Sequence, residues 1–435
     1  MIVIYRLLAL PFLLLTAPFY IRRKLRRGGL LLHWQQRLGF IPVRLREKAS
    51  GKKRIWIQAV SVGEILAIQS LIEQFRASGH FEIVLTTTTS TGYQAARKCY
   101  GESLLFIGLF PIDFFPCSTL AWSRIQPDCI VLAESELWPE HLHQASRHSI
   151  PVYLINARLS DRSYRRMKAW SLLSRFLLSK VGTLFCATQV DYERFLDLGA
   201  GPEKAIGNIK LDVPFEPPMN MDEKIEALRA MGLQSNKREN FTLIGASTWE
   251  GEESTLLEAQ QACLEAGIDC RLILVPRHVE RREALMKHLR QQKLAWSSAS
   301  GAQSSTSENS DIQIFLADTT GALVQLLRLA DLAFIGKSLS PHQGGQTPIE
   351  AAAQGIPLLM GPNMSNFTSI SKALIKAGAA LQVADAEELK LTILNLASDA
   401  DTRSKMGVAG QHWHKSNKGI SGQIYQHILK HFLVE

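Results

Sequence analysis

The chain has 435 residues, 46% hydrophobic and 20% charged, which is a globular composition and too long for one usual core, so two domains are expected. Its formal net charge of +9 favours an anionic partner such as a membrane surface, a phosphorylated lipid or a nucleic acid. The six cysteines are scattered without a CxxC pair, which argues against a disulfide framework and against a structural zinc site.

The N-terminus predicts a membrane anchor. Residues 1–21 are nearly all apolar, about long enough to cross a bilayer, and a basic cluster over residues 22–27 should keep the remainder of the chain on the cytoplasmic side. Arg6, Pro11 and Pro18 weaken a spanning helix, so a helix lying in the membrane interface stays open as an alternative. In either case we expect residues 1–24 to tether the chain to a membrane.

Residues 54–77 predict a strand, a turn and one helix. The strand is apolar at 55–57, the turn falls at Val62-Gly63, and apolar residues at helical spacing continue to Phe75. Ser61 and Glu64 have the spacing of a capping box, in which Glu64 reaches back to the backbone N–H of Ser61. Glu64 is therefore either a capping residue or a carboxylate placed at a strand end, where the sites of open α/β sheets lie.

Five more segments before residue 212 have strand character, and they alternate with helices, so the first half predicts a parallel, doubly wound sheet. These segments are Phe81–Leu85, Asp128–Ala133, Pro151–Ile155, Thr183–Ala187 and Ala205–Ile209. Their ends carry a hydroxyl-rich loop over Thr87–Gly92 and the charged residues Glu134, Glu136 and Arg158, a rim that suits a polyhydroxylated substrate. For the two glutamates, ordinary solvation or a salt bridge to Arg158 is an equal alternative.

Residues 161–180 predict one basic amphipathic helix. It either lies on a membrane or contacts phosphates, or it exposes a solvated face above a core stripe.

The proline-rich segment 213–218 predicts a linker between two domains, 25–212 and 219–415, with a C-terminal helix in 416–435. Strands are expected at 241–245, 270–275, 331–336 and 356–360, and a helix at 420–433. The polar, low-complexity residues 297–311 predict a surface loop without chemistry.

Three places in the second half predict anion binding. Ser247 and Thr248 fall where a strand gives way to a helix, and Arg277 follows the next strand. Gly344 and Gly345 precede a further helix, which lets the backbone approach a phosphate, although the Lys-Ser/Thr pair of a Walker loop is absent.

Ten segments, in order, resemble the lipid A Kdo (3-deoxy-D-manno-octulosonic acid) transferases of Gram-negative envelopes. The segments are SVGE (61–64), TTTTSTG (86–92), ESELWP (134–139), NARLS (156–160), GNIKLD (207–212), ASTWEGEE (246–253), ILVPRH (273–278), ADLAFIG (330–336), GGQTPIEAAA (344–353) and LMGPN (359–363).

The resemblance implies a GT-B fold, in which two Rossmann-like α/β domains face a cleft. It implies an inverting glycosyltransferase of the cell inner membrane that moves Kdo from CMP-Kdo to a lipid A precursor of lipid IVA type, in lipopolysaccharide biosynthesis. The N-terminal domain would bind the acceptor and the C-terminal domain the sugar nucleotide. No cofactor, metal or nucleic acid is implied.

The family's catalytic base falls on Glu64. Its nucleotide-sugar contacts fall on Ser247, Thr248, Pro276, Arg277, Gly336, Gly344, Gly345, Thr347 and Glu350. Acceptor or transition-state contacts fall on Ser61, Gly63, Thr89, Gly92, Glu134, Glu136, Arg158 and Lys210. The chain departs from the family at Trp249, where His is usual, and at Gln346-Thr347, where His-Asn is usual.

Two other functions remain open from the sequence. One is a GT-B transferase or epimerase acting on a UDP-sugar. The other is a non-catalytic, basic, membrane-tethered binding protein, for example one that binds nucleic acid, although carboxylates at the strand ends would repel a phosphate backbone.

Overall fold

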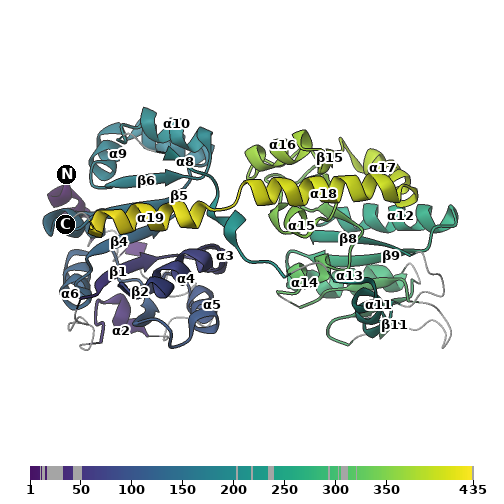
Figure 1. Cartoon of the computed structure of the whole chain (residues 1–435), viewed down its shortest axis with the longest axis horizontal. Helices are drawn as coiled ribbons and strands as arrows, with labels where there is room; N and C mark the ends of the chain where they lie inside the picture. Colours follow the sequence, from purple (N-terminus) through teal and green to yellow (C-terminus); the bar gives the residue numbers. More distant parts are fainter. Residues whose placement is uncertain are drawn as a thin grey trace. The chain divides into compact units, whose positions relative to one another are not determined.

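The computed structural model describes residues 1–9, 11, 15–16, 33–42, 51–201, 204–216, 219–233, 240–291, 294–301, 303–304, 312–319 and 321–433. The chain forms two compact units (Figure 1). Unit 1 consists of Met1–Pro214 together with Gly419–Glu435, and unit 2 consists of Phe215–Lys418.

Unit 1 contains a seven-stranded sheet in the order β3-β2-β1-β4-β5-β6-β7, with every neighbouring pair parallel. Because all strands are parallel, their carboxyl ends meet at one edge. The strands are β1 (Lys53–Gln58), β2 (Phe81–Thr87), β3 (Phe106–Leu109), β4 (Cys129–Ala133), β5 (Val152–Ala157), β6 (Thr183–Cys186) and β7 (Lys204–Ala205). The strand predicted over 205–209 is present as β7 but wrong in its extent, because β7 ends at Ala205 and a 3₁₀ turn, η2 (Ile209–Asp212), comes after it.

Helices cover both faces of this sheet, as the burial of every residue from Arg54 to Gln58 in β1 requires. Ile55 and Ile57 pack with α3 (Val62–Ala67), α4 (Gln69–Ser78) and α5 (Ser90–Tyr100). Trp56 belongs to the core on the other face, with α6 (Phe115–Ile125), α7 (Pro139–Arg147), α9 (Ser171–Leu178) and α10 (Gln189–Asp197). The short α2 (Trp34–Arg37) contacts β3.

Two predicted helices are each broken in the structure. The apolar stripe over 65–75 is buried as predicted, but Ile68 leaves helical geometry and separates α3 from α4. The basic segment 161–180 breaks at Trp170, which separates α8 (Asp161–Ala169) from α9. Both breaks occur at apolar residues that continue the helical spacing, so the pattern gave no sign of them.

Unit 2 contains an eight-stranded sheet in the order β11-β10-β12-β9-β8-β13-β14-β15, parallel except for the pair β10–β11. The strands are β8 (Phe241–Thr248), β9 (Cys270–Pro276), β10 (Trp296–Ser298), β11 (Gln303–Ser304), β12 (Ile314–Leu316), β13 (Leu332–Ile335), β14 (Leu358–Met360) and β15 (Ala380–Gln382). The predicted loop over 297–311 is wrong at its start, because Ser297 and Ser298 are buried in β10. Residues 305–311 lie outside the described residues.

The helices of unit 2 surround this sheet (Figure 1). They are α11 (Met221–Ala230), α12 (Glu252–Glu265), η3 (Val279–Arg281), α13 (Arg282–Gln291), α14 (Leu323–Leu327), α15 (Ile349–Gln354), α16 (Thr368–Lys376), α17 (Ala386–Ser398) and α18 (Ala400–Ser416).

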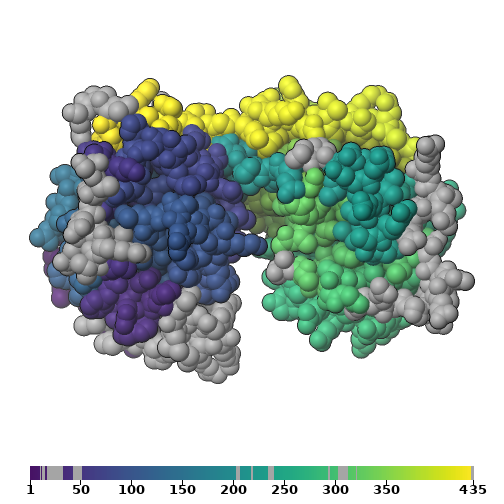
Figure 2. All heavy atoms as spheres, turned by 60° about the horizontal axis from the view of Figure 1, so that its bottom comes forward, coloured from purple at the N-terminus to yellow at the C-terminus, as the bar shows by residue number. Residues whose placement is uncertain are grey.

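The C-terminal helix α19 (Ile420–Leu433) packs on unit 1, against α4. In both views α19, the yellow helix at the C-terminus, lies against the blue N-terminal part of the chain (Figures 1 and 2). Its contacts are apolar: the Tyr425 ring lies 5.4 Å from that of Phe75, and Ile424 and Ile428 are fully buried. Asp212 fixes the start of the helix, because its carboxylate accepts hydrogen bonds from the backbone N–H groups of Gly419, at 2.7 Å, and Ser421.

The predicted membrane anchor is described only in part. Residues 2–9 are helical, whereas residues 10, 12–14 and 17–24 lie outside the described residues. Within the described part of the chain, no helix is long and apolar enough to cross a membrane.

We predict that Asp212→Ala lowers the free energy of unfolding by about 1–2 kcal/mol, because two backbone N–H groups at the start of α19 lose their acceptor. Urea unfolding monitored by circular dichroism measures the change. Asp222→Ala, at an exposed aspartate in the first turn of α11, is the matched control. Equal losses in the two variants would show that the cap contributes nothing.

Candidate active site

Glu64 is held in one orientation at the start of α3, directly beyond the end of β1. Its Oε2 accepts a hydrogen bond from the backbone N–H of Val60 at 2.8 Å, and its Oε1 accepts one from the Ser61 hydroxyl at 2.8 Å. The predicted capping box is therefore wrong in one bond: Glu64 reaches the N–H of Val60, not that of Ser61. The Ser61 hydroxyl donates to Oε1 of Glu64, and Oε2 accepts from the backbone amide of Val60, the residue before Ser61.

The hydroxyl-rich loop after β2 is fastened to the Glu64 loop. Thr89 Oγ1 donates to the carbonyl oxygen of Val60 at 2.8 Å and accepts from the N–H of Gly92 at 3.0 Å. A Cβ on Gly92 would lie 2.7 Å from Thr87 Oγ1, so only glycine fits there. At Gly63 an added Cβ would meet nothing within 4 Å, so packing does not require glycine at that position.

Two further predicted residues lie close to Glu64. Glu134 comes directly after β4 in a left-handed conformation, with φ of 58°, and its Oε1 pairs with Lys210 Nζ at 3.1 Å. Glu64, Glu134 and Asn156 line one narrow pocket, so the ends of β1, β4 and β5 converge there. For Glu134 the sequence suggested solvation or a salt bridge to Arg158, but not this ion pair with Lys210. Arg158 directly follows β5 and is half-buried.

Glu136 belongs to the same group of carboxylates. It accepts a hydrogen bond from Trp138 Nε1 at 2.7 Å. Burial, above all, raises the pKa of Glu136 to about 7; the charges of Glu64 and Glu134 raise it as well, while hydrogen bonds from Trp138 and Gln58 lower it. The charges of Glu64 and Glu134 therefore both act on the Glu136 carboxyl.

Gln58 is a member of the site that the sequence did not indicate. It is fully buried at the end of β1, where its Oε1 accepts from Thr86 Oγ1 at 2.8 Å and its Nε2 donates to Thr88 Oγ1 at 3.0 Å. The available signal was a lone amide directly after the apolar run Ile55–Ile57. Gln58 connects the hydroxyl-rich loop to Glu136.

The environment of Glu64 suits a general base. Glu64 is 9% exposed, and this burial raises the pKa of its carboxyl. The charge of Glu134 raises the pKa further, while the Val60 N–H, the Ser61 hydroxyl and Lys210 lower it. A carboxylate has about four acceptor positions. Among the described residues two donors use them, one on each oxygen, so the carboxylate keeps acceptor capacity for a substrate hydroxyl.

In unit 2, the ends of β9, β8 and β13 bring five predicted residues together. Gly336, directly after β13, packs so tightly on the end of β8 that an added Cβ would lie 2.4 Å from the Ser247 carbonyl oxygen. The N–H of Arg277, next to Pro276, donates to the carbonyl oxygen of Thr248 at 3.0 Å. Arg277 is exposed, so its side chain is accessible to a ligand.

The Gly344-Gly345 loop is tied back to the same edge. Both glycines have positive φ, of 110° and 68°, and the N–H of Gly345 donates to the Lys337 carbonyl oxygen at 3.0 Å. Thr347 and Glu350 pair with each other, because Thr347 Oγ1 donates to Glu350 Oε2 at 2.7 Å.

Glu252 holds these loops in place, a role that its sequence motif does not indicate. Its buried carboxylate accepts four backbone N–H groups: those of Trp249 at 2.9 Å, Lys337 at 2.8 Å, Ser338 at 2.9 Å and Leu339 at 3.2 Å. These donors come from the loops after β8 and β13, so one side chain fixes the relative position of both.

Trp249, where the chain departs from the family, stands in an aromatic and basic cluster. Its ring lies 5.1 Å from that of His278 and 5.4 Å from that of His342, and Lys337 Nζ lies 4.7 Å from its centre. At this position the Trp249 ring therefore packs against side chains that come after β9 and β13.

Among the described residues, no group of three or more His, Cys, Asp and Glu side chains is arranged to hold a metal ion.

Comparisons with known proteins identify relatives along most of the chain. A family model described as 3-deoxy-D-manno-octulosonic-acid transferase matches residues 32–213. The chain is 31% identical over 386 residues to the 3-deoxy-D-manno-octulosonic acid transferase of Haemophilus influenzae, covering 87% of each chain. It is 29% identical to that of Bordetella pertussis over 412 residues, covering 92% of each chain.

Among solved structures, a putative UDP-N-acetylglucosamine 2-epimerase from Listeria monocytogenes is similar with a TM-score of 0.61 and 15% identity. The similarity covers 88% of this chain and 98% of the epimerase. At this identity it shows a shared fold of two parallel-sheet α/β domains and nothing about the reaction.

We predict that Trp138→Phe raises the pKa of Glu136 above its value of about 7, because the hydrogen bond from the indole favours the charged carboxylate and the phenyl ring cannot replace it. The measurement is a ¹³C NMR titration with labelled glutamate, with the resonance assigned through Glu136→Gln. Trp413→Phe, on α18 in unit 2, is the control and should leave the titration unchanged. An unchanged or lower pKa in Trp138→Phe would contradict this explanation of the carboxylate group.

Proposed function

The chain belongs to the family of 3-deoxy-D-manno-octulosonic acid (Kdo) transferases, and we propose that it transfers Kdo from CMP-Kdo to a hydroxyl of a lipid A precursor of lipid IVA type. The observation that carries this proposal is the position of Glu64: a mostly buried carboxylate with two fixed donors, beside a second glutamate, a lysine and a hydroxyl-rich loop. This is the arrangement that deprotonation of a sugar hydroxyl requires.

In the proposed reaction, Glu64 accepts the proton of the acceptor hydroxyl while that oxygen attacks the anomeric carbon of Kdo. The new carbon–oxygen bond forms as the bond from the anomeric carbon to the phosphate oxygen breaks, with inversion, and CMP leaves with the bonding electrons. The raised pKa of Glu64 makes its carboxylate a better proton acceptor than an ordinary glutamate. The Val60 and Ser61 donors keep the carboxylate in the orientation that attack requires.

Unit 2 would bind the donor. The exposed guanidinium of Arg277 suits the phosphate of CMP, since arginine forms strong charge-assisted bonds to phosphate. Ser247 and the Gly344-Gly345 loop lie at the same edge, and the paired Thr347 and Glu350 suit the ribose hydroxyls. Trp249, with Lys337 over its ring, would replace the usual histidine in shaping this pocket.

We further propose that the enzyme works at the cytoplasmic face of the inner membrane, in a GT-B arrangement, without a metal or cofactor. The formal net charge of +9 supports attraction to a membrane with anionic lipids. Arg6 in the N-terminal helix forms an ion pair with Glu140, which favours attachment at the surface over full insertion for residues 2–9. Exposed basic residues of unit 1 would contact the phosphates of the lipid.

We predict that Glu64→Gln lowers the turnover of Kdo transfer by at least ~100-fold, the low end of what a general base contributes, while the fold is retained. Glutamine can keep one of the two fixed hydrogen bonds, but it cannot take up a proton. The measurement is CMP release at saturating CMP-Kdo and acceptor, with thermal unfolding as the check on the fold.

The matched control for that experiment is Glu73→Gln, at an exposed glutamate on the neighbouring helix α4. If Glu64→Gln retained most of the turnover, Glu64 would be only a capping residue.

We predict that Arg277→Ala raises the KM for CMP-Kdo by about 10-fold to 100-fold with a smaller effect on turnover, because a charge-assisted hydrogen bond contributes about 1.5–3 kcal/mol. Arg282→Ala, at an exposed arginine five residues further along on α13, is the control. Initial-rate kinetics over a range of donor concentrations give both constants. A KM equal to that of the control would remove Arg277 from the donor site.

A further inference from the structure

Unit 1 contains a large apolar pocket that the proposed reaction does not use. Its volume is about 720 Å³, within the range of sites that bind small molecules. It is lined by the N-terminal helix, chiefly Ile4, Tyr5 and Leu8, by Ile112 and Trp138, and by the segment Ala169–Leu173 that joins α8 to α9.

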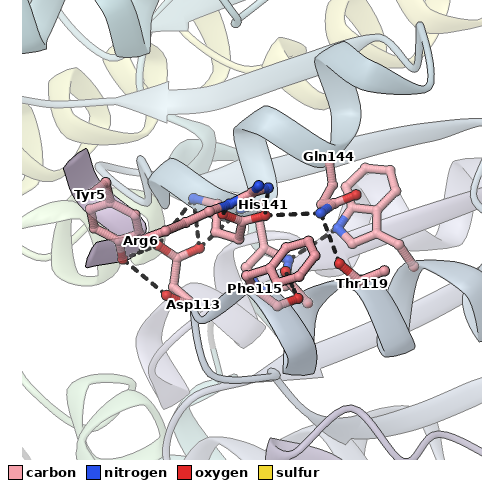
Figure 3. A network of polar contacts seen from close by, with 10 residues as sticks. Tyr5, Arg6, Asp113, Phe115, Thr119, His141 and Gln144 are labelled. Carbon is pink, nitrogen blue, oxygen red and sulfur yellow. Dashed lines mark hydrogen bonds and ion pairs between the residues drawn. The ribbon is translucent and has the colours of Figure 1, made fainter. Parts of the chain in front are cut away.

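The N-terminal helix, which forms part of this lining, is docked by a buried polar network (Figure 3). Arg6 donates to both carboxylate oxygens of Glu140, at 2.9 and 2.8 Å, and the Glu140 side chain is 0% exposed. The Tyr5 hydroxyl donates to Asp113 Oδ2 at 2.6 Å. A bidentate ion pair to a fully buried carboxylate places the helix specifically, because an unpaired Glu140 would be strongly unfavourable. Arg6, which weakened the predicted membrane span, has this role instead.

The same network leaves the pocket walls apolar. The Asp113 carboxylate also accepts the backbone N–H groups of Glu140 and His141 at the start of α7. Gln144 donates to Glu140 Oε1 at 2.9 Å and to Thr119 Oγ1 at 3.0 Å. The carboxylates near the pocket are therefore engaged with protein donors, so that an apolar ligand would meet carbon atoms rather than bare charges.

Exposure and charge around the pocket indicate its ligand. Trp170 and Leu172 are 67% and 77% exposed, and Leu8 is exposed as well, so the pocket opens among large apolar side chains that water surrounds. The helix that leads into it, α8, carries four exposed cations: Arg162, Arg165, Arg166 and Lys168. An apolar cavity beside a basic helix is complementary to an acyl chain whose head group is anionic.

We propose that this pocket binds one acyl chain of the phosphorylated lipid acceptor, with the docked N-terminal helix as part of its wall and α8 contacting the head group. The inference rests on the proposed lipid acceptor and specifies where its chain is held. Placement in this pocket would bind the lipid to unit 1 independently of the donor.

The direct test is calorimetric binding of dodecyl phosphate to the full chain, below the critical micelle concentration of the amphiphile. We expect binding that is stronger than that of dodecyl glucoside and that weakens by up to about fourfold for each methylene removed. Inorganic phosphate alone should not bind measurably. Equal binding of the neutral glucoside, or no binding of either amphiphile, would overturn the proposal.

Two variants locate the binding. Leu8→Asp places a carboxylate in the pocket and should weaken dodecyl phosphate binding by at least ~10-fold, since an unpaired charge is costly in an apolar site. Trp170→Ala removes apolar wall and should weaken it too, without adding a charge. Leu391→Asp, at an exposed leucine on α17 in unit 2, is the control and should bind as the wild type does. Wild-type binding by both pocket variants would overturn the proposal.

The kinetics of Kdo transfer distinguish a failure of the pocket proposal from a failure of the proposed function. Leu8→Asp should raise the KM for the acylated acceptor and leave the kinetics of the deacylated phosphorylated disaccharide unchanged. An equal effect on both acceptors would contradict an acyl-chain site.

If the variants lost binding to phosphatidylglycerol vesicles but kept dodecyl phosphate binding, the surface would be a general membrane contact and the proposal would be wrong. Absence of transfer by the wild type, with the calorimetric pattern intact, would reject the proposed function and leave the pocket standing.

Discussion

The chemistry proposed for this chain depends on the hydrogen bonds that fix the Glu64 carboxylate, one from the Val60 amide and one from the Ser61 hydroxyl. They place the side chain directly beyond the end of β1, an interior strand of the sheet, and hold it beside the ends of the neighbouring strands. Thr89 ties the adjacent loop to the carbonyl oxygen of Val60, so the same residue anchors both the carboxylate and the hydroxyl-rich loop. A freely rotating glutamate would have to be oriented in each turnover, whereas this one is oriented by folding.

Each unit uses a glutamate at the start of the helix that comes after its first strand in sequence, but the two carboxylates are used differently. Glu252 accepts four backbone N–H groups, which occupies the acceptor capacity of a carboxylate. Glu64 accepts one donor on each oxygen from the described residues. Glu252 is therefore a positioning residue for the loops after β8 and β13, while Glu64 retains capacity for a substrate. The number of donors, rather than the residue type, distinguishes their roles.

Sequence reasoning located the parts of the fold that local pattern determines. The buried stripe from Ile65 to Phe75 and the long strands β1, β2, β8 and β9 can be read directly from apolar spacing. It did not identify β3 and β12, although it did locate β13 and β14, which are no longer than these. The return of α19 to unit 1 was not predicted either, since the apolar face of a helix does not specify what covers it.

The site divides in the same way. Glu64, Glu134 and Glu136 could be identified as residues at the ends of strands, and the structure brings their charges within mutual influence. Gln58 and Glu252 could not be assigned roles, because their partners lie far away in the chain, at Thr88 for the one and at Ser338 for the other. The interactions of Arg6 were likewise inaccessible, since nothing in an apolar N-terminal run indicates a buried Glu140 as its partner.

The most direct test of the proposed reaction is mass spectrometry of the lipid formed when the purified full-length chain is incubated with a lipid A precursor and either CMP-Kdo or UDP-sugars. We expect a product heavier than the acceptor by Kdo, with one CMP released for each Kdo transferred, and no product from the UDP-sugars. Turnover of a UDP-sugar with no reaction of CMP-Kdo would contradict the proposed reaction.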